Sequence, residues 1–280
     1  MSRGGLFTVG RSRRPVTATL VLGSIILLAF LVIGLVPGFF APYDPIEFNY
    51  DTLLSPPSAE HPFGTDNYGR DIFSRVVWGT RVDLQIALSG TVIPIVLGTI
   101  VGAIVGYVGG WAEFFFGRIV DIVVAFPFLV LVIAIIAVLG PGLFNMYIAV
   151  SVVGWVAYAR LMRSEVLIQK EMDYAAAGRG MGYGAPRIIF RHLLPNAITP
   201  VVIYWMTDMA LVILLGSSLG YLGLGAQPPT PEWGVLIANG KNFMATAWWI
   251  STFPGIAIVV VGVGFSLVGD GIADLIRPSG

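Results

Sequence analysis

The sequence contains no cysteine and only two histidines, His61 and His192. Without cysteine the chain can form no disulfide, and it has no thiolate for catalysis or for binding zinc. Two isolated histidines do not form a metal-ligand pattern, so we expect no metal site. Charged residues make up only 11% of the 280 residues, and their signs balance to a net charge of zero. Such a balance gives no basis for binding nucleic acid.

Motifs for nucleotide binding and catalysis are also missing. No G-x-x-x-x-G-K-[ST] occurs, so the chain lacks this phosphate-binding loop for ATP. The glycine-rich string GRGMGYG at 178–184 follows no strand and is followed by no lysine, and no HExxH zinc motif is present. We expect no catalytic residue and no cofactor bound by this chain, which is therefore not predicted to be an enzyme.

What the sequence has in abundance is apolar residues. Hydrophobic residues make up 56% of it, and the mean hydropathy is +0.84. A soluble monomer could not bury this much apolar surface, and a run of about 20 apolar residues is long enough to cross a bilayer. We therefore predict an all-α membrane protein with six transmembrane helices. Their expected ranges are about 17–39, 84–112, 119–139 with a kink at Pro127, 144–163, 197–222 and 248–272.

The first apolar run follows a group of arginines and has two possible interpretations. The arginine pair in the string SRRPV is also compatible with a twin-arginine export signal. The apolar run that follows is too long for a signal peptide and has no small-x-small cleavage site, so we favour a retained first span.

The spans divide the chain into four regions. These are a cytoplasmic N-terminal segment (1–15), a first transmembrane helix (16–40), an extracytoplasmic loop with an interfacial helix (41–83), and a five-helix core (84–276) that contains a cytoplasmic loop (160–196).

The basic residues indicate the orientation. With these boundaries, twelve Lys and Arg lie on one side of the membrane and four on the other, and the side with more of them is the inside. Both termini are then cytoplasmic. The 41–83 loop carries seven acidic and three basic residues, as expected outside. In this loop we expect His61 to be exposed, and we expect Ile72, Val76 and Val77 to form one face of the interfacial helix.

Two features within the spans stand out. Gly98, Gly102, Gly106 and Gly110 recur at every fourth position, which predicts a seam for close helix packing. Asp208 is the one isolated acid inside a span, where a charge costs about 2.5–3.5 kcal/mol, so it should face protein or water. It either lines a transport path that accepts a cationic amine or forms a hydrogen bond between helices, and the sequence favours neither.

The longest polar interval of the second half, 160–196, carries six of the sixteen basic residues. Helical spacing predicts a short helix near 173–181, with Tyr174, Ala177, Gly178 and Met181 on one face. Its glycines weaken it by roughly 1 kcal/mol each, so we expect it to dock into a partner. A second helix is expected to open at Pro186 and to stop before Pro195.

This loop resembles the EAA loop of ABC importer permeases. Ala177, Gly182, Leu194 and Pro195 match that motif, whereas Ala176 stands where the motif has an acid and Gly178 where it has a second alanine. Asp173 is close enough to supply the missing charge. The string RIIFRHLLPN is similar to the C-type permeases of dipeptide, oligopeptide and nickel transporters, as are FGTDNYGRDIFSRVVWG and SLGYLGLGAQPPTPEWG. The resemblance assigns ATPase coupling to Asp173, Tyr174, Ala176, Ala177, Gly178, Gly182, Arg187, Arg191, His192 and Pro195.

The resemblance covers about residues 43–278 and implies the type I ABC importer (MetI-like) permease fold. It implies a subunit of an ATP-driven peptide importer in the inner membrane of a prokaryote. The expected partners are a second homologous permease, two ATPases that bind ATP and magnesium, an extracytoplasmic substrate-binding protein and membrane lipid. Cargo such as a nickel complex, glutathione or an oligosaccharide remains an alternative within this architecture. The other function class is an ion-coupled secondary carrier that works alone, although no internal repeat supports it.

Overall fold

The computed structural model describes residues 18–276, and this part of the chain is helical apart from its loops and one isolated bridge between Thr65 and Asp71. Five helices in it are long and apolar enough to cross a membrane: α1 (Ala18–Leu35), α3 (Ile72–Val108), α6 (Leu143–Gln169), the continuous stretch Ala185–Tyr221, and α11 (Trp249–Ile276). The bent pair α4 (Gly110–Val124) and α5 (Phe128–Leu139) makes a sixth span if it is counted as one.

The remaining elements are short. The stretch Ala185–Tyr221 consists of α8 (Ala185–Ile188), the π-helix η2 (Ile189–Leu193) and α9 (Leu194–Tyr221). The others are α2 (Pro37–Phe40), η1 (Tyr50–Thr52), α7 (Asp173–Gly180), α10 (Trp233–Gly240) and η3 (Lys241–Phe243).

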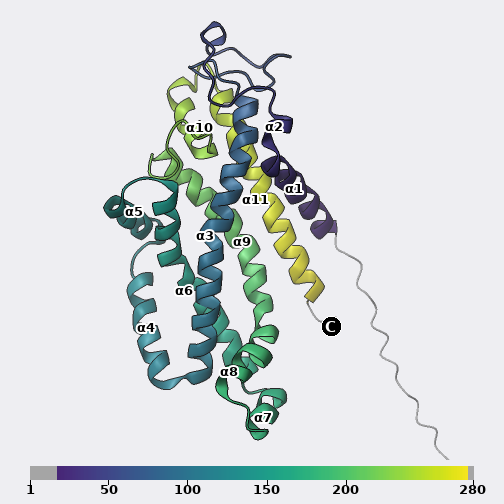
Figure 1. Ribbon diagram of the computed structural model, residues 1–280, viewed down its shortest axis with the longest axis vertical. Coiled ribbons are helices and arrows are strands. Elements are labelled where there is room, and N and C mark those ends of the chain that lie inside the picture. Colours follow the sequence, from purple (N-terminus) through teal and green to yellow (C-terminus); the bar gives the residue numbers. More distant parts are fainter. Residues whose placement is uncertain (1–17, 277–280) are drawn as a thin grey trace, which may run out of the picture.

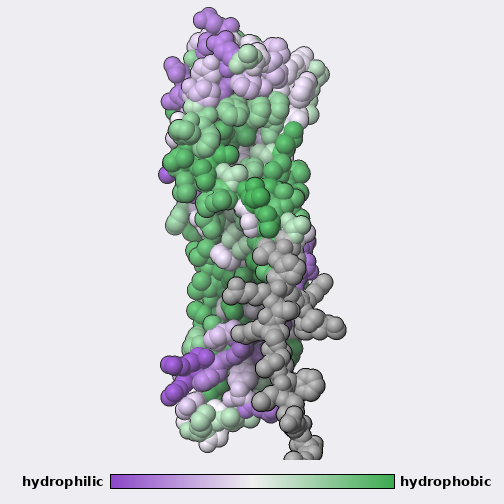
Figure 2. All heavy atoms as spheres, turned by 90° about the vertical axis from the view of Figure 1, so that its right-hand side faces the viewer, coloured by the Kyte–Doolittle hydropathy of each residue, from purple (hydrophilic) through white to green (hydrophobic). Residues whose placement is uncertain are grey.

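The long helices lie side by side along the long axis of the molecule (Figure 1). The 41–71 loop and α10 lie at one end of the bundle, and α7 and α8 lie at the other. Figure 2 shows a hydrophobic band between two ends where hydrophilic residues gather. The exposed leucines of the long helices, such as Leu28 of α1 (61% exposed), suit a bilayer better than water.

The most extensive helix contact is that of α3 with α6, and three glycines let the two backbones approach each other. A Cβ atom on Gly98 would lie 2.4 Å from the carbonyl oxygen of Trp155, and one on Gly102 would lie 2.3 Å from that of Ala159. At Gly106 the nearest atom is the Arg163 carbonyl oxygen, at 3.0 Å. Backbone therefore packs on backbone over two turns, as small-residue seams in lipid allow.

Gly110 does not belong to this seam. It is the first residue of α4, has φ +55°, and a Cβ there would meet no atom within 4 Å. The four-residue repeat continues in the sequence, but α3 ends at Val108 and the chain turns away at Gly109, which has φ +66°. The predicted seam is wrong at its last position because the helix ends before it.

A second close contact, which the sequence did not indicate, joins α1 to α11. A Cβ on Gly23 would lie 2.8 Å from Leu267 Cβ, and one on Gly271 would lie 2.5 Å from Leu20 Cβ. Gly264 similarly faces Ile26. These glycines are far apart in the sequence, so no single window shows their common role. They hold the first span against the last.

The interfacial helix expected within 41–83 is instead the beginning of α3. That helix runs without interruption from Ile72 to Val108. Ile72, Val76 and Val77 are buried, and the indole nitrogen of Trp233 donates to the carbonyl oxygen of Val76 at 3.0 Å. Their apolar face is covered by Trp233, in the chain that follows α9, rather than by lipid headgroups. The spacing of apolar residues shows that a helix has an apolar face, but it does not show what covers that face.

Two predicted boundaries are also corrected. The expected kink at Pro127 is a break, because α4 and α5 meet at 85° and Pro127 occupies the N-cap position of α5. The helix expected to stop before Pro195 continues into α9. A proline inside a helix lacks an N–H donor and crowds the preceding turn, and the wider π-helix immediately before it relieves both problems.

Replacement of a seam glycine tests the α3–α6 contact. We expect Gly102→Ala to lower the free energy of unfolding by about 1–3 kcal/mol, because the added methyl group overlaps a carbonyl oxygen. Gly117→Ala is the matched control, since a Cβ there meets nothing within 4 Å and alanine favours a helix interior. Thermal unfolding in detergent measures both, and equal unfolding temperatures would contradict the close contact.

Candidate functional site

The short helix α7 ends through a left-handed glycine. The N–H of Met181 donates to the carbonyl oxygen of Ala177 at 2.9 Å, and the N–H of Tyr183 donates to that of Gly178 at 3.1 Å. Gly182 lies between these donors with φ +77°, which a residue with a side chain rarely adopts. The matched glycine of the EAA-like string thus reverses the chain so that α8 can begin.

The two faces of α7 have different surroundings. Ala175 and Gly178 are buried against the chain's own residues, and a Cβ on Gly178 would lie 3.7 Å from the Tyr183 ring and 3.9 Å from Ile188. Gly178 was predicted on the opposite face, and its position corrects that prediction. The exposed face holds Tyr174, Ala176, Ala177 and Met181, the last 62% exposed.

Hydrogen bonds tie α7 to the end of α6. The guanidinium of Arg179 donates to the carbonyl oxygen of Lys170 at 2.8 Å, and the ammonium of Lys170 donates to that of Gly106 on α3 at 3.1 Å. The hydroxyl of Tyr174 donates to the side-chain oxygen of Gln169 at 2.7 Å. These hydrogen bonds therefore join α7 to both helices of the glycine seam.

Beside α7 lies a stack of basic and aromatic side chains. The guanidinium carbon of Arg187 lies 3.9 Å from the centre of the Tyr183 ring, and that ring stacks on His192 at 5.8 Å. Arg187, Arg191 and Pro195 are exposed. Asp173 is exposed too and forms no ion pair within residues 18–276.

A cavity of about 590 Å³ lies between the α4–α5 break, α6 and α9. Most residues that line it are apolar, such as Phe126, Val150 and Leu215. Asp208 lines it as well, and its Oδ2 accepts a hydrogen bond of 2.6 Å from the hydroxyl of Tyr158. Asp208 thus forms the hydrogen bond between helices that one interpretation expected, and it also faces a cavity, so the transport-path interpretation stays a prediction.

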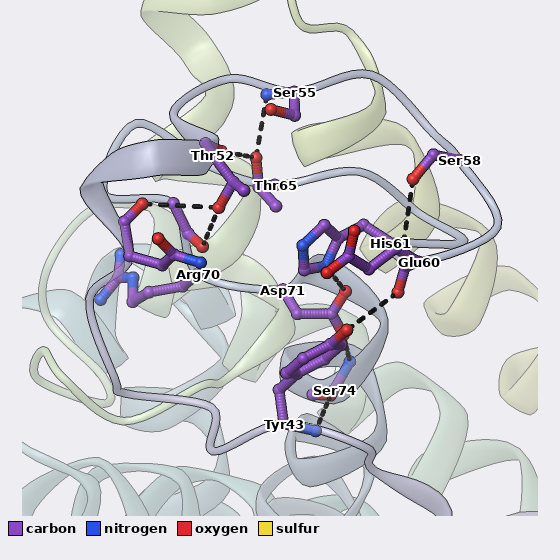
Figure 3. A network of polar contacts seen from close by, with 12 residues as sticks. Tyr43, Thr52, Ser55, Ser58, Glu60, His61, Thr65, Arg70, Asp71 and Ser74 are labelled. Atoms are coloured by element: carbon purple, nitrogen blue, oxygen red, sulfur yellow. Dashed lines mark hydrogen bonds and ion pairs between the residues drawn. The ribbon is translucent and has the colours of Figure 1, made fainter.

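At the opposite end of the bundle, the 41–71 loop is held by a polar network (Figure 3). Asp71 caps α3 by accepting from the N–H of Ser74 at 2.7 Å, and its other oxygen lies 2.9 Å from Nδ1 of His61. The Oγ of Ser74 accepts from the N–H of Tyr43 at 3.1 Å. His61 is only 5% exposed, so its predicted exposure is wrong. The loop folds over it, which local sequence does not predict.

A second group of buried charges fixes the same loop to α3. Asp66 is 1% exposed and accepts from Nε of Arg70 at 2.8 Å, while Nε of Arg75 lies 3.8 Å away. Arg75 also donates to the carbonyl oxygen of Pro45 at 2.7 Å. The indole of Trp249 on α11 donates to the carbonyl oxygen of Thr65 at 3.0 Å. These contacts fix the loop against α3 and α11, so it is part of the packed fold.

Sequence reasoning missed a pair of buried carboxyl groups, Asp83 and Glu232. Glu232 caps α10 by accepting from the N–H groups of Gly234 and Val235 at 2.7 and 2.9 Å, and burial raises its pKa. Asp83 accepts from the N–H of Trp233 at 3.1 Å. Asp83 and Glu232 also interact with each other, so this buried pair joins α3 to α10. They lie 149 positions apart, and only a three-dimensional structure brings them together.

One string in α9, GSSLG at 216–220, fits the G-x-S-x-G pattern of serine hydrolases. The pattern requires a sharp strand-to-helix turn, whereas this string lies inside a continuous helix. The Oγ of Ser218 donates to the carbonyl oxygen of Leu214, one turn earlier in the same helix, at 2.7 Å. Ser218 is therefore an ordinary helix residue, and the match to the hydrolase pattern does not identify a nucleophile.

Comparison with known families gives a match over most of the bundle. Residues 98–279 match the family described as "Binding-protein-dependent transport system inner membrane component". The chain belongs to this family. It is thus a permease subunit of an ABC importer and not the subunit that carries the ATPase site, which fits the apolar bundle described above.

Several curated relatives of this permease span almost its full length. The dipeptide transport system permease protein DppC of Alkalihalophilus pseudofirmus is 40% identical over 92% of this chain and 85% of its own length. The probable D,D-dipeptide transport system permease protein DdpC of Escherichia coli K12 is 38% identical over 94% and 88%. The glutathione transport system permease protein GsiD of Pectobacterium atrosepticum is 37% identical over 92% and 86%.

The fold of the permease also has a solved counterpart. A chain of the MetNI methionine ABC transporter, titled as inward facing, matches with a TM-score of 0.59 and 20% identity. The match covers 72% of this permease and 97% of the other chain. At this identity the likeness shows a shared fold, which is the type I importer fold expected from the sequence.

The buried ion pair of the outer loop gives a prediction about stability. Asp66→Asn leaves two buried guanidinium groups without their carboxylate, so we expect it to cost about 3–5 kcal/mol of unfolding free energy. Asp121→Asn is the control, because Asp121 pairs with Arg118 at 3.7 Å on an exposed surface and such pairs contribute at most about 1 kcal/mol. Thermal unfolding of the two purified variants compares them. Similar losses would show that the loop network does not support the fold.

Proposed function

We propose that this permease is one half of the translocation pathway of an importer for short peptides. The support is that relatives named for dipeptides, D,D-dipeptides and glutathione all match along nine-tenths of the chain. The three cargoes share a peptide backbone with a free amine and a free carboxylate. A nickel complex or an oligosaccharide in the same architecture lacks this support.

Coupling to two ATPase subunits through α7 is the second part of the proposal, and one observation carries it. An eight-residue helix with three glycines or alanines on its open side keeps only Ala175 and Gly178 buried against its own chain. Isolated helices of this length are not stable in water, so a partner that covers the open face supplies the missing contacts. The ATPases, and not this chain, bind ATP and magnesium.

The proposed mechanism is alternating access. Closure of the ATPases around ATP displaces α7, and the bonds of Lys170 and Arg179 pass the displacement to α3 and α6. Because α6 forms one wall of the cavity, its movement changes access to the cavity from each side of the membrane. A helix contact of a few kcal/mol suffices to shift such an equilibrium between two states.

The remaining partners follow from the two other surfaces. The exposed apolar belt is available to a second, homologous permease and to lipid. The rigid outer loop is available to an extracytoplasmic substrate-binding protein. Both termini and α7 are then cytoplasmic. Since the chain has no cysteine, single cysteines at Tyr50 and Met181 test the orientation. We expect the cysteine at position 50, and not the one at position 181, to react with a membrane-impermeant reagent added outside the cell. The opposite result would show that the proposed orientation is wrong.

An ion-coupled carrier is the competing function. It would transport without ATPases, so the purified chain alone in liposomes would accumulate peptide under an ion gradient. Within residues 18–276 the charged residues that line the cavity are Asp208 and Arg160, and they lie inside the helices α9 and α6 rather than on matching broken helices, so they do not support such coupling. We expect no uptake by the chain alone and ATP-dependent uptake by the assembled complex.

Gly182→Asp tests the docking of α7. In the chain alone a Cβ atom at this position meets no atom within 4 Å, and the positive φ costs roughly 1–2 kcal/mol. Under a docked ATPase the same side chain meets a protein surface, so we expect loss of peptide uptake and of ATP hydrolysis stimulated by the binding protein.

Gly223→Asp is the matched control for this variant. Gly223 has φ +76°, and a Cβ there also meets nothing within 4 Å, but it lies after α9 at the other end of the bundle. The backbone strain of Gly223→Asp should therefore equal that of Gly182→Asp, but the proposed ATPase contact does not reach this position. We expect this variant to hydrolyse ATP normally. Normal coupled hydrolysis in both variants would refute docking at α7.

A further inference from the structure

The cavity beside the α4–α5 break has one acid and one base among its lining residues. Among residues 18–276, Asp208 on α9 and Arg160 on α6 are the only charged side chains that line it, and the rest of the lining is mainly aliphatic and aromatic. Its volume of about 590 Å³ lies within the range of about 300–1,000 Å³ that is usual for small-molecule sites. A largely apolar wall with a few polar groups is the common composition of such sites.

Both charged groups have unused bonding capacity. Asp208 accepts one hydrogen bond at Oδ2 from Tyr158, and Oδ1 has no hydrogen-bond partner within residues 18–276. Arg160 forms no ion pair with any residue of the same part of the chain, although Glu113 pairs with Arg163 one turn further along α6. A carboxylate can accept several bonds and a guanidinium can donate five, so the pair is far from saturated.

The arrangement differs from that of the structural charges elsewhere in the chain. Asp66, Arg70 and Arg75 are almost completely buried and pair with one another. Asp208 and Arg160, in contrast, face open space on two different helices. If Asp208 served only to join the helices, an amide would accept the Tyr158 hydrogen bond equally well. A charge facing an apolar cavity requires a charged partner to offset its desolvation.

We propose that Asp208 and Arg160 receive the two charged ends of a peptide as it passes through the membrane. The proposal rests on the proposed peptide-import function and identifies the groups that recognise the cargo. Asp208 accepts hydrogen bonds from the α-ammonium group, and Arg160 donates to the α-carboxylate. Tyr158 positions the Asp208 carboxylate. The apolar wall between them contacts the side chains of the peptide without selecting among them.

The test uses the whole complex in liposomes, with its binding protein loaded with one neutral dipeptide. Because the substitutions are in the permease, the binding step remains the same in every sample. The readout is the number of peptides taken up per ATP hydrolysed. In Asp208→Asn and Arg160→Gln we expect this ratio to fall by about tenfold or more, as the loss of a charge-assisted hydrogen bond implies, with unchanged stimulation of ATP hydrolysis.

Four further variants separate recognition from structure. Asp208→Glu and Arg160→Lys keep the charges and should restore most of the ratio. Thr207→Ala changes the exposed neighbour of Asp208 outside the cavity, and Arg118→Gln removes an exposed arginine on α4. Both controls should keep the wild-type ratio.

Two results would overturn the inference. The first is a wild-type ratio in Asp208→Asn and Arg160→Gln, in which case the cavity holds lipid or the neighbouring permease. The second is a loss of assembly or of ATP hydrolysis that the charge-conserving variants fail to restore, which would make the two residues structural. Absence of ATP-dependent dipeptide uptake in the wild-type complex would instead refute the proposed function itself.

Discussion

The direct contact of backbone on backbone between α3 and α6 is the constraint on which the rest of the structure depends. Gly98, Gly102 and Gly106 remove the side chains that would separate the two helices. In lipid, where apolar side chains gain little from burial against each other, such close contact provides much of the available packing energy. Since α6 carries Arg160 to the cavity, holds Asp208 through Tyr158 and leads directly into α7, its position against α3 fixes both candidate regions.

The two candidate regions, α7 and the cavity, are therefore connected through α6. At one end of α6, the side chains of Lys170 and Arg179 join α3, α6 and α7 through backbone carbonyl groups. In its middle, Tyr158 bonds to Asp208 on α9. The outer end of the bundle is fixed separately by buried charges, as in the Asp66 and Asp83 groups. The outer end is thus held by more buried polar contacts than α7, which keeps only Ala175 and Gly178 buried against its own chain.

The features that could be predicted from the sequence are those that depend on residues close together in the chain. Hydropathy indicated the spans, four-residue spacing indicated three of the four seam glycines, and helical spacing located α7. Features that depend on distant contacts were missed. His61 is buried because the loop folds over it, Gly110 leaves the seam because α3 ends at Val108, and Asp83 meets Glu232 across 149 positions. Asp208 was flagged from its charge alone, whereas Arg160 acquired a role only once the cavity was visible.

The central claim is that an ATPase covers the exposed face of α7 in the assembled importer. Hydrogen–deuterium exchange of residues 173–184 measures this directly, in the permease pair alone and with the ATPases bound. We expect the backbone amides of α7 to exchange quickly in the permease pair, because the helix is short and half uncovered, and at least about tenfold more slowly in the full complex. Exchange at the same rate in both samples, in a complex that hydrolyses ATP, would contradict the account.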